Sequence, residues 1–397
     1  MIHKITIENY YSLRDEITLD FKIPKNAPEL NAFYKDQHNE RYPKVIGVFG
    51  HNASGKTNVV KALAFLRFFV LNSHMLGKDD SIPVSSFSFC PDAEAAPIKF
   101  NIEYEVFGEV YEYKLCLTSE AVISEELRRR DVRSIIFKRK AKSISSSDKS
   151  IKKLSGIVSE KSSLLSFCFH NSIDIELLKV PIDGFSLSFS NMTSMGRDNI
   201  TSSLIKSVLK ATDAHFGKTE IKNKAIEMLS KFDLGLCDIR LEEKEFIDDN
   251  GKVSLRKIPF VFHRINGTEK KLFIGQESNG TQSLYVLILD LLETLYTGGV
   301  AIIDEIDAYL HSHMLKTILD LFYDDDTNPH GAQLIFTGHA DYIMTFLEKE
   351  QIILVEKDEE CVTDAYLLKE VKGVRRDDNI REKYHAGAYG GIPEDNF

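Results

Sequence analysis

The segment GHNASGKT, from Gly50 to Thr57, constrains this chain more than any other part of its sequence. It fits the pattern G-x-x-x-x-G-K-[ST] and lies between an apolar run, VIGVFG at 45–50, and a helical pattern at 57–70. Glycine lets the backbone turn tightly, so that successive N–H groups and the N-terminus of the following helix face an anion. The segment therefore predicts a buried strand, a phosphate-binding loop and a helix in succession. A chance glycine-rich turn is the alternative.

Each position of this loop has an expected role. The Lys56 ammonium is expected to neutralise charge on the β- and γ-phosphates of a nucleotide, and the Thr57 hydroxyl to coordinate Mg²⁺. The backbone that wraps the phosphates is expected to come from Gly50, Ala53, Ser54 and Gly55. The loop thus predicts a nucleoside triphosphate and Mg²⁺ as ligands.

A second motif, VAIIDEID at 300–307, places two acids directly after an apolar run. In a parallel sheet, the carboxyl ends of the strands lie at the edge where a phosphate loop is also found. We expect Asp304 to hold the Mg²⁺ and Glu305 to polarise the attacking water as a general base. Two solvated acids at the end of a strand are the alternative.

Two further motifs carry polar groups at the ends of predicted elements. FTGH ends in His339 after the apolar run QLIF, and a side chain there can reach a γ-phosphate; a purely structural histidine is the alternative. ESNGTQ, at 277–282, opens a strongly apolar helix with Ser278 as a hydroxyl cap. Its open backbone donors predict a second anion site, and a simple N-cap is the alternative.

Composition narrows the class of protein. The chain has 397 residues and a net charge of -10, which argues against coating nucleic acid by bulk charge. At 125–153, however, eleven Lys or Arg accompany four Asp or Glu, a local excess of +7. Contact with DNA, RNA or an acidic partner is the functional interpretation of this segment, and a solvated hairpin face is the alternative.

Other features bear on the compartment. No apolar stretch reaches the roughly 18 residues that a membrane span needs. The five scattered cysteines include no C-x-x-C pair, which indicates a reducing environment. We therefore expect a cytoplasmic protein that makes no contact with a membrane.

The order of the predicted elements indicates an α/β fold with a mostly parallel core sheet and antiparallel additions. Alternating strand patterns precede the phosphate loop and return at 98–139. A serine- and lysine-rich stretch at 141–166 is followed by helical patterns up to 232. We predict an N-terminal lobe at 1–140, an inserted, mainly helical subdomain at 141–235 and a C-terminal lobe at 236–397.

In this order, the motifs resemble the head of ABC-type ATPases, in the branch that contains SMC, RecF and OLD proteins. ITIENYYSL at 5–13, Asn52 in the phosphate loop, the continuation SGKTN to Asn58, and DEIDAYLH at 304–311 carry the resemblance. It implies a P-loop ABC-type ATPase head that binds ATP and Mg²⁺, with Asn52 and Asn58 among the nucleotide-binding residues.

The same resemblance implies a composite site. Two heads would sandwich two nucleotides, as a homodimer or a higher homo-oligomer. His311 would lie in the interface loop that follows the catalytic acid. The signature motif that completes the site of the other head would consist of Ser278, Asn279, Gly280 and Thr281.

Longer stretches narrow the resemblance to the AbiL/RloA group of abortive-infection ATPases of prokaryotes. These stretches are SEELRRRDVRSIIFKRK, LGLCDIRLEE, GQESNGTQSLYVLILDLL and HAGAYGGIPEDNF. The pattern G-x-Y-G-G-I-P, at 387–393, is the most particular of them. The resemblance implies phage defence together with an operon-encoded effector protein, often a nuclease of Toprim-like fold.

We therefore expect an ATPase that uses Lys56, Glu305 and His339 in catalysis and acts as a sensor and scaffold for a toxic effector. A RecF/SMC-like DNA repair or recombination ATPase, which clamps duplex DNA, is the alternative. An ATPase whose own cycle is toxic without a partner is a third. Salt-dependent DNA binding through 125–153 would favour the DNA-clamping ATPase. A stable co-purifying partner would favour the sensor and scaffold for an effector. No nuclease site is expected within this chain.

Overall fold

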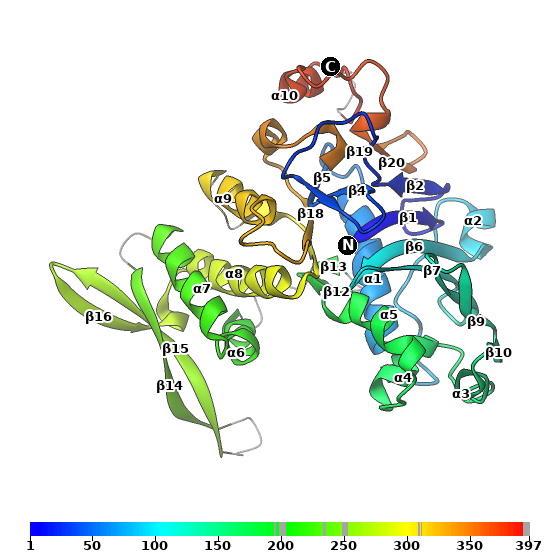
Figure 1. Cartoon of the computed structure of the whole chain (residues 1–397), viewed down its shortest axis with the longest axis horizontal. Helices are drawn as coiled ribbons and strands as arrows, with labels where there is room; N and C mark the ends of the chain where they lie inside the picture. The colour runs from blue at the N-terminus through cyan, green and yellow to red at the C-terminus, as the bar shows by residue number, and fades with distance from the viewer. Residues whose placement is uncertain are drawn as a thin grey trace.

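The computed structural model describes residues 1–193, 196–197, 204–232, 236–247, 253–308, 310 and 312–391. Two large sheets and the helix α1 (Lys56–Asn72) form the head of the molecule, and a smaller lobe extends from it to the left in Figure 1. Among the described helices, none combines the length and the apolar composition that crossing a membrane requires.

The central sheet has six strands in the order β11-β17-β18-β5-β19-β20. These strands are β11 (Phe189–Ser190), β17 (Val300–Ile303), β18 (Gln333–Thr337), β5 (Val45–Phe49), β19 (Ile352–Lys357) and β20 (Thr363–Leu367). All neighbours pair in parallel except β19 and β20, which are antiparallel. The predicted, mostly parallel core sheet is therefore confirmed.

Alternate residues of the central sheet enter two different hydrophobic cores. In β5, Ile46 and Val48 join the core around α1, whereas Val45 and Phe49 join the core around α8 (Asn279–Thr297) and α9 (Ser312–Tyr323). Because both faces are covered, these strands appear in the sequence as uninterrupted apolar runs. The polar functional motifs begin directly after these doubly buried strands end.

The second sheet is antiparallel and has seven strands in the order β10-β9-β8-β7-β6-β1-β2. They are β1 (Ile2–Glu8), β2 (Ile17–Asp20), β6 (Ile98–Val106), β7 (Glu109–Leu117), β8 (Val122–Arg129), β9 (Ser134–Lys140) and β10 (Ser143–Ser145). β6 and β7 are joined at Phe107 and Gly108, whose φ angles of 50° and 79° suit a two-residue hairpin loop. The strand patterns of the N-terminal third are thus confirmed.

The segment expected to be one helical insert contributes to both cores. α3 (Lys149–Lys152), α4 (Leu164–His170) and α5 (Glu176–Ser186) bury apolar side chains in the core around α1. α6 (Leu204–His215) and α7 (Thr219–Phe232) instead pack against α8. The short strands β12 (Met192–Thr193) and β13 (Gly196–Arg197) lie between the two groups of helices in the sequence. The division at 141 and 235 stays a prediction.

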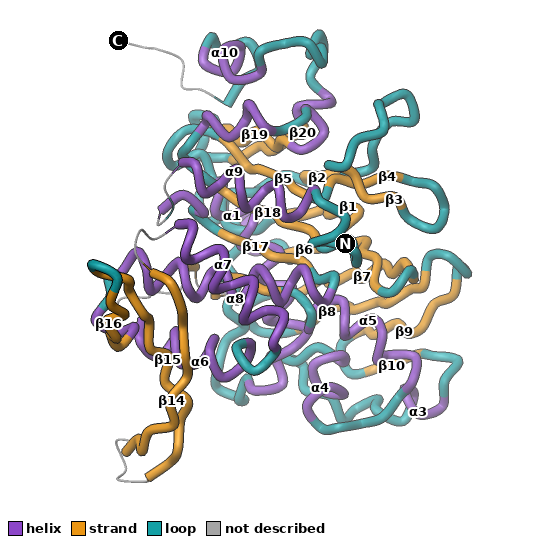
Figure 2. Tube along the Cα trace, turned by 60° about the vertical axis from the view of Figure 1, so that its left-hand side comes forward, coloured by secondary structure: helices purple, strands orange, loops and turns teal. Residues whose placement is uncertain are grey.

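A third sheet, β14-β15-β16, covers α6 and α7. Its strands are β14 (Leu236–Ile247), β15 (Val253–Ile265) and β16 (Thr268–Phe273). β14 and β15 extend past the helices as a two-stranded ribbon in both views (Figures 1 and 2).

Residues 23–43 contain a short hairpin of β3 (Phe33–Lys35) and β4 (Arg41–Pro43). The buried Arg41 side chain organises this segment by donating to the carbonyl oxygens of Pro24, Ala27 and Pro28. Sequence periodicity does not show such contacts. The remaining helices are α2 (Pro91–Ala95) and α10 (Ile380–His385).

Candidate nucleotide-binding site

The phosphate loop joins the end of β5 to the start of α1, as the sequence predicts. A Cβ atom on Gly55, which has a φ of 109°, would lie 2.3 Å from Oγ1 of Thr363. A Cβ atom on Gly50 would lie 2.2 Å from the carbonyl oxygen of Val355. Only glycine fits at these two positions, because the loop is packed directly against β19 and β20.

Neighbouring segments hold the loop in place. Thr363 donates from Oγ1 to the carbonyl oxygen of Ser54 at 2.9 Å, and the Asn58 side chain donates to Oγ of Ser12 at 2.7 Å. The Ser54 hydroxyl is buried and has no hydrogen-bond partner among the described residues. Asn52 and Ala53 are exposed at the tip. The loop thus presents its tip to solvent on a rigid base.

Lys56 points back over the loop that precedes it. Its ammonium donates to the carbonyl oxygens of Gly50 and His51, each at 2.9 Å. Burial lowers the pKa of Lys56, and the negative charges of Asp304, Glu305 and Asp307 partly oppose this shift. A bound polyphosphate can offer this ammonium an anionic partner in place of two carbonyl oxygens.

Asp304 lies where the helix α1 and two strands of the central sheet, β17 and β18, converge. The Thr57 hydroxyl, on α1, lies 3.2 Å from Oδ1 of Asp304, directly after β17. Thr337, the last residue of β18, donates from Oγ1 to the same oxygen at 2.6 Å. A hydroxyl and a carboxylate are oxygen ligands of the kind that Mg²⁺ prefers. The predicted metal ligands Thr57 and Asp304 therefore meet, and their chemistry fits the ion.

The backbone of Asp304 is also clamped from the edge of the sheet. Asn191, just beyond β11, donates from Nδ2 to the carbonyl oxygen of Asp304 at 2.9 Å, and its Oδ1 accepts the N–H of Asp304 at 2.8 Å. Sequence reasoning missed Asn191, because it lies far upstream of the acidic motif and belongs to no recognisable pattern. Thr337 belongs to the quoted motif FTGH, yet its contacts could not be read from that motif.

Glu305 and His339 face each other across the same edge of the sheet. Glu305 has a left-handed φ of 50°, and its N–H donates to Oγ1 of Thr337 at 2.8 Å. Its Oε1 lies 3.8 Å from Nε2 of His339, and the two side chains are 40% and 52% exposed. Asp307 accepts the N–H groups of His339 and Ala340 at 2.8 and 2.7 Å. The predicted base and the predicted phosphate sensor are therefore adjacent and open to solvent.

The predicted signature lies elsewhere on the chain. Ser278 caps α8, and its Oγ accepts the N–H of Thr281 at 3.1 Å. α8 has 19 residues, and a helix of that length is about 28 Å long. It begins beside α7 and β16 and ends at the central sheet (Figure 1). Asn279 and Gly280 form its first turn. The predicted interface residue His311 lies outside the described residues.

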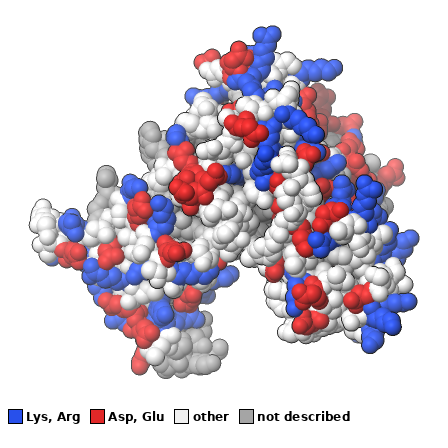
Figure 3. All heavy atoms as spheres, in the orientation of Figure 1, with Lys and Arg blue, Asp and Glu red and all other residues white. Residues whose placement is uncertain are grey.

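The basic segment 125–153 forms β8, β9, β10 and α3. Six of its eleven cations make ion pairs: Arg128, Arg129, Arg130, Lys138, Arg139 and Lys142. The other five are exposed and have no ion pair with a described residue: Arg133, Lys140, Lys149, Lys152 and Lys153. Blue spheres gather over this part of the surface at the lower right of Figure 3.

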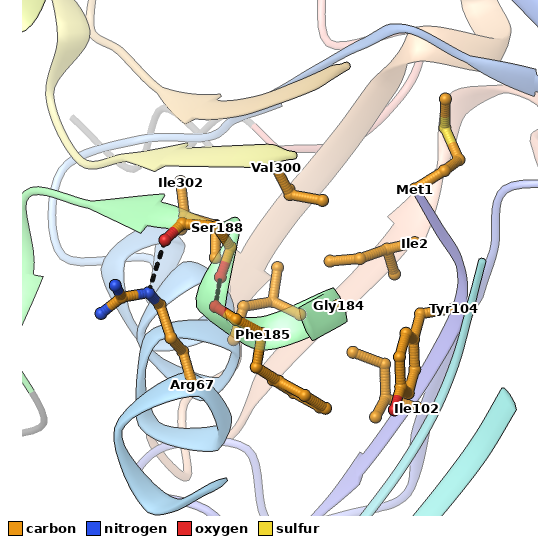
Figure 4. A pocket seen from close by; sticks show the side chains of 11 residues that line it. Met1, Ile2, Arg67, Ile102, Tyr104, Gly184, Phe185, Ser188, Val300 and Ile302 are labelled. Carbon is orange, nitrogen blue, oxygen red and sulfur yellow. Dashed lines mark hydrogen bonds between the residues drawn. The ribbon is translucent and has the colours of Figure 1, made fainter. Parts of the chain in front are cut away.

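A small hollow lies between α1, α5 and the strands β1, β6 and β17 (Figure 4). Its lining is mostly apolar and includes Met1, Ile102 and Val300. Arg67 borders it, and its Nε donates to the carbonyl oxygen of Ser188 at 2.7 Å. An apolar lining of this kind does not suit a polyphosphate.

The sequence of this chain matches a known protein family and one curated relative. Residues 45–345 match the sequence profile of the family described as "AAA domain, putative AbiEii toxin, Type IV TA system". Over 127 residues, 29% of this chain, the sequence is 28% identical to the "Retron Vc95 probable ATPase" of Vibrio cholerae serotype O1 biovar El Tor. The matched part of this chain spans only about a quarter (24%) of the length of the retron protein.

Solved structures show the fold. The SMC head bound to the C-winged helix domain of ScpA matches with a TM-score of 0.50 at 14% identity, over 92% of this chain and 96% of that one. The SMC head domain from Thermotoga maritima has a TM-score of 0.43 at 13% identity, over 92% of this chain and 98% of that one. The predicted α/β fold of a P-loop ATPase head is confirmed by the first of these.

Proposed function

The chain belongs to the family described as "AAA domain, putative AbiEii toxin, Type IV TA system", and on this premise we propose that it binds and hydrolyses ATP with Mg²⁺ in a site shared between two copies. The observation that carries the proposal is the meeting of Thr57, Asp304 and Thr337 beside the phosphate loop. Three separate parts of the sequence supply these groups, and their oxygen atoms are of the kind that a Mg²⁺–triphosphate needs as ligands, which supports the proposal.

The residues at this edge divide the work of hydrolysis. The backbone of the phosphate loop and the Lys56 ammonium bind the β- and γ-phosphates. Thr57 and Asp304 would hold Mg²⁺, which would neutralise charge on the phosphate oxygens. Glu305 accepts a proton from a water molecule while the oxygen of that water attacks the γ-phosphorus. The bond to the β-phosphate oxygen breaks, so ADP and phosphate leave. His339 donates a hydrogen bond to the γ-phosphate oxygens.

The second copy would supply the signature. Ser278–Thr281 opens α8 beside the lobe formed by α7 and β16, at the end of the helix away from the central sheet (Figure 1). The N-terminus of a long helix favours an anion. We infer that it completes the site of a partner copy, so that a homodimer or a higher homo-oligomer contains two such sites.

The biological role follows from the relatives. The family description names a toxin–antitoxin system, and one relative is a retron ATPase. We infer that the chain is a sensor and scaffold in antiphage defence, whose ATP cycle holds or releases an operon-encoded effector, with a Toprim-like nuclease as the expected class. A nuclease-like open reading frame beside this gene, whose product co-purifies with the chain, would support this role. Purification of the chain alone from cells that express both would contradict it.

One observation favours a second function, that of a RecF/SMC-like ATPase that clamps duplex DNA. Five exposed cations have no acidic partner among the described residues and can therefore face phosphates: Arg133, Lys140, Lys149, Lys152 and Lys153. Binding to duplex DNA that weakens steeply with salt, and is lost when Lys140, Lys152 and Lys153 are changed to Glu, would support it. Binding that is equally weak in both chains would exclude it.

The dependence of turnover on protein concentration tests the composite site. A monomer would hold only half of each site, so ATP turnover per chain should fall steeply on dilution. The variant Lys56→Ala should lose nucleotide binding at every concentration, which controls for a contaminating ATPase. Turnover per chain that stays constant across a wide dilution range would contradict a shared site.

A further inference from the structure

The C-terminal segment from α10 to Gly391 lies on the edge of the head that carries the phosphate loop. Tyr384 and Tyr389 are 8% and 6% exposed. The Tyr366 hydroxyl, from β20, donates to the carbonyl oxygen of Tyr389 at 2.9 Å. The segment is therefore packed onto the central sheet.

One attachment reaches the phosphate loop itself. The carbonyl oxygen of Gly391 accepts the N–H of His51, the second residue of the loop motif, at 3.1 Å. The same oxygen accepts the Tyr384 hydroxyl at 3.1 Å, and the N–H of Gly391 donates to Glu356 of β19 at 3.1 Å. Both the N–H and the carbonyl oxygen of Gly391 are thus hydrogen-bonded, and the carbonyl oxygen holds His51 at the start of the phosphate loop.

The close approach depends on glycine. Gly390 has a φ of 78°, and a Cβ atom there would lie 2.3 Å from the Tyr366 hydroxyl and 2.8 Å from Oε2 of Glu356. A side chain at this position would therefore push the segment away from β19 and β20, and the carbonyl of Gly391 away from His51. Gly387 has a similar φ of 71° but nothing within 4 Å of its Cβ position, so it offers a matched control.

A second attachment reaches the segment that carries His339. Asp341 lies two residues after His339 and opens the short helix Asp341–Phe346. Its carboxylate lies 3.4 Å from Nη2 of Arg381 and pairs with His385, both on α10. Because Asp307 holds the backbone N–H of His339 from the other side, this segment is fixed at two points.

We propose that Arg381 and His385 are positioning residues for ATP hydrolysis, and that the segment Ile380–Gly391 ties the His339 segment to the start of the phosphate loop. This inference rests on the proposed ATPase function. The strands β18 and β5 pair directly, and the C-terminal segment adds a second link between the loops that follow them, through Asp341 and through His51. Arg381 acts through Asp341 on His339, and Gly391 acts through His51 on the phosphate loop.

A plain structural anchor for the end of the chain is the competing explanation, and the two differ in which kinetic constant changes. If Arg381 positions His339, the variants Arg381→Ala and Asp341→Asn lower kcat, while ATP affinity stays near that of the wild type. A misplacement of about 1 Å near reacting groups can cost about a hundredfold, so we expect a fall in kcat of about tenfold to a hundredfold. Arg381→Lys, which keeps the charge, should recover most of the rate.

The test uses the full chain, with ATP turnover and the affinity for a fluorescent ATP analogue measured on each variant. The control Lys383→Ala removes a cation from the same helix, but one that pairs with Asp378 within the C-terminal segment. It should leave kcat unchanged. The double variant of Arg381 and Asp341 should be no slower than the worse single variant, because each single variant already removes the contact between these two residues.

The loop attachment has its own pair of variants. Gly390→Ala should weaken ATP binding, whereas Gly387→Ala should bind ATP like the wild type. If the wild type is active and Arg381→Ala has the same kcat as Lys383→Ala, the inference is overturned. Equal ATP affinity of Gly390→Ala and Gly387→Ala would also overturn it. A wild-type chain that binds ATP but never hydrolyses it would overturn the proposed function as well. Should Arg381→Ala fail to fold, Asp341→Asn reports on the same contact from the other side.

Discussion

Thr337 offers the sharpest single perturbation of the candidate site. Its hydroxyl donates to the Asp304 carboxylate at 2.6 Å and accepts the N–H of Glu305 at 2.8 Å. Thr337 and Asp304 are only 1% and 3% exposed, so water cannot replace either bond. One hydroxyl thus orients the predicted metal ligand and the predicted base together.

The substitution Thr337→Val keeps the shape of the side chain and removes both bonds. A hydrogen bond to a charged group contributes about 1.5–3 kcal/mol, and a buried donor left without a partner costs about 1–3 kcal/mol. We expect the free energy of unfolding to fall by about 2–4 kcal/mol. If half of this loss also appears in the transition state, kcat falls by about fivefold to thirtyfold.

The assay is steady-state ATP turnover beside thermal or urea unfolding, with Thr337→Ser as the control. Serine keeps the hydroxyl and loses one methyl group, which costs about 1 kcal/mol of burial but leaves both hydrogen bonds. The serine variant should therefore retain most of the activity. A valine variant as active as the serine variant would refute the reasoning, because the hydroxyl would then position neither acid.

Two further predictions concern the candidate site, and a third concerns a buried ion pair of the antiparallel sheet. Glu305→Gln should bind ATP but not turn it over, and should shift the chain to dimers in size-exclusion chromatography with ATP; normal turnover would show that Glu305 is not the base. Asn191→Ala should lower kcat, because the backbone of Asp304 loses two hydrogen bonds, and unchanged kinetics would contradict that role. Arg139→Ala should cost about 3–5 kcal/mol of stability by leaving the buried Glu125 unpaired. The exposed control Arg133→Ala should change stability by less than about 0.5 kcal/mol.

Local motifs allowed most of the site to be predicted, because the spacing of a phosphate loop reflects the geometry of one continuous turn. The loop residues, Thr57 and the two acids at 304 and 305 occupy adjacent positions at the edge of the sheet, as their strand-end positions indicated. The alternation of apolar residues likewise predicted the antiparallel strands near the N-terminus. In each case, the information lies within a few residues of the feature.

Contacts between distant segments could not be predicted in this way. Asn191 follows a two-residue strand at the edge of the sheet, and its clamp on Asp304 depends on how that strand registers with β17. The G-x-Y-G-G pattern stood out in the sequence, but nothing there indicated that Gly391 would reach His51. The basic segment shows the same limit, since its sequence does not reveal that Arg139 is buried among the carbonyl oxygens of Ser159 and Ser162.

Mixing two inactive variants tests the shared site most directly. Lys56→Ala should disable the phosphate loop of its own chain, and Ser278→Arg should disable the signature that this chain lends to its partner. In a mixed dimer, one site then carries both defects and the other carries none. An equal mixture should recover about a quarter of the wild-type turnover, because half of the randomly formed dimers are mixed and each contains one intact site of two. The account predicts this recovery; a mixture as inactive as either variant alone, although mixed dimers form, would contradict it.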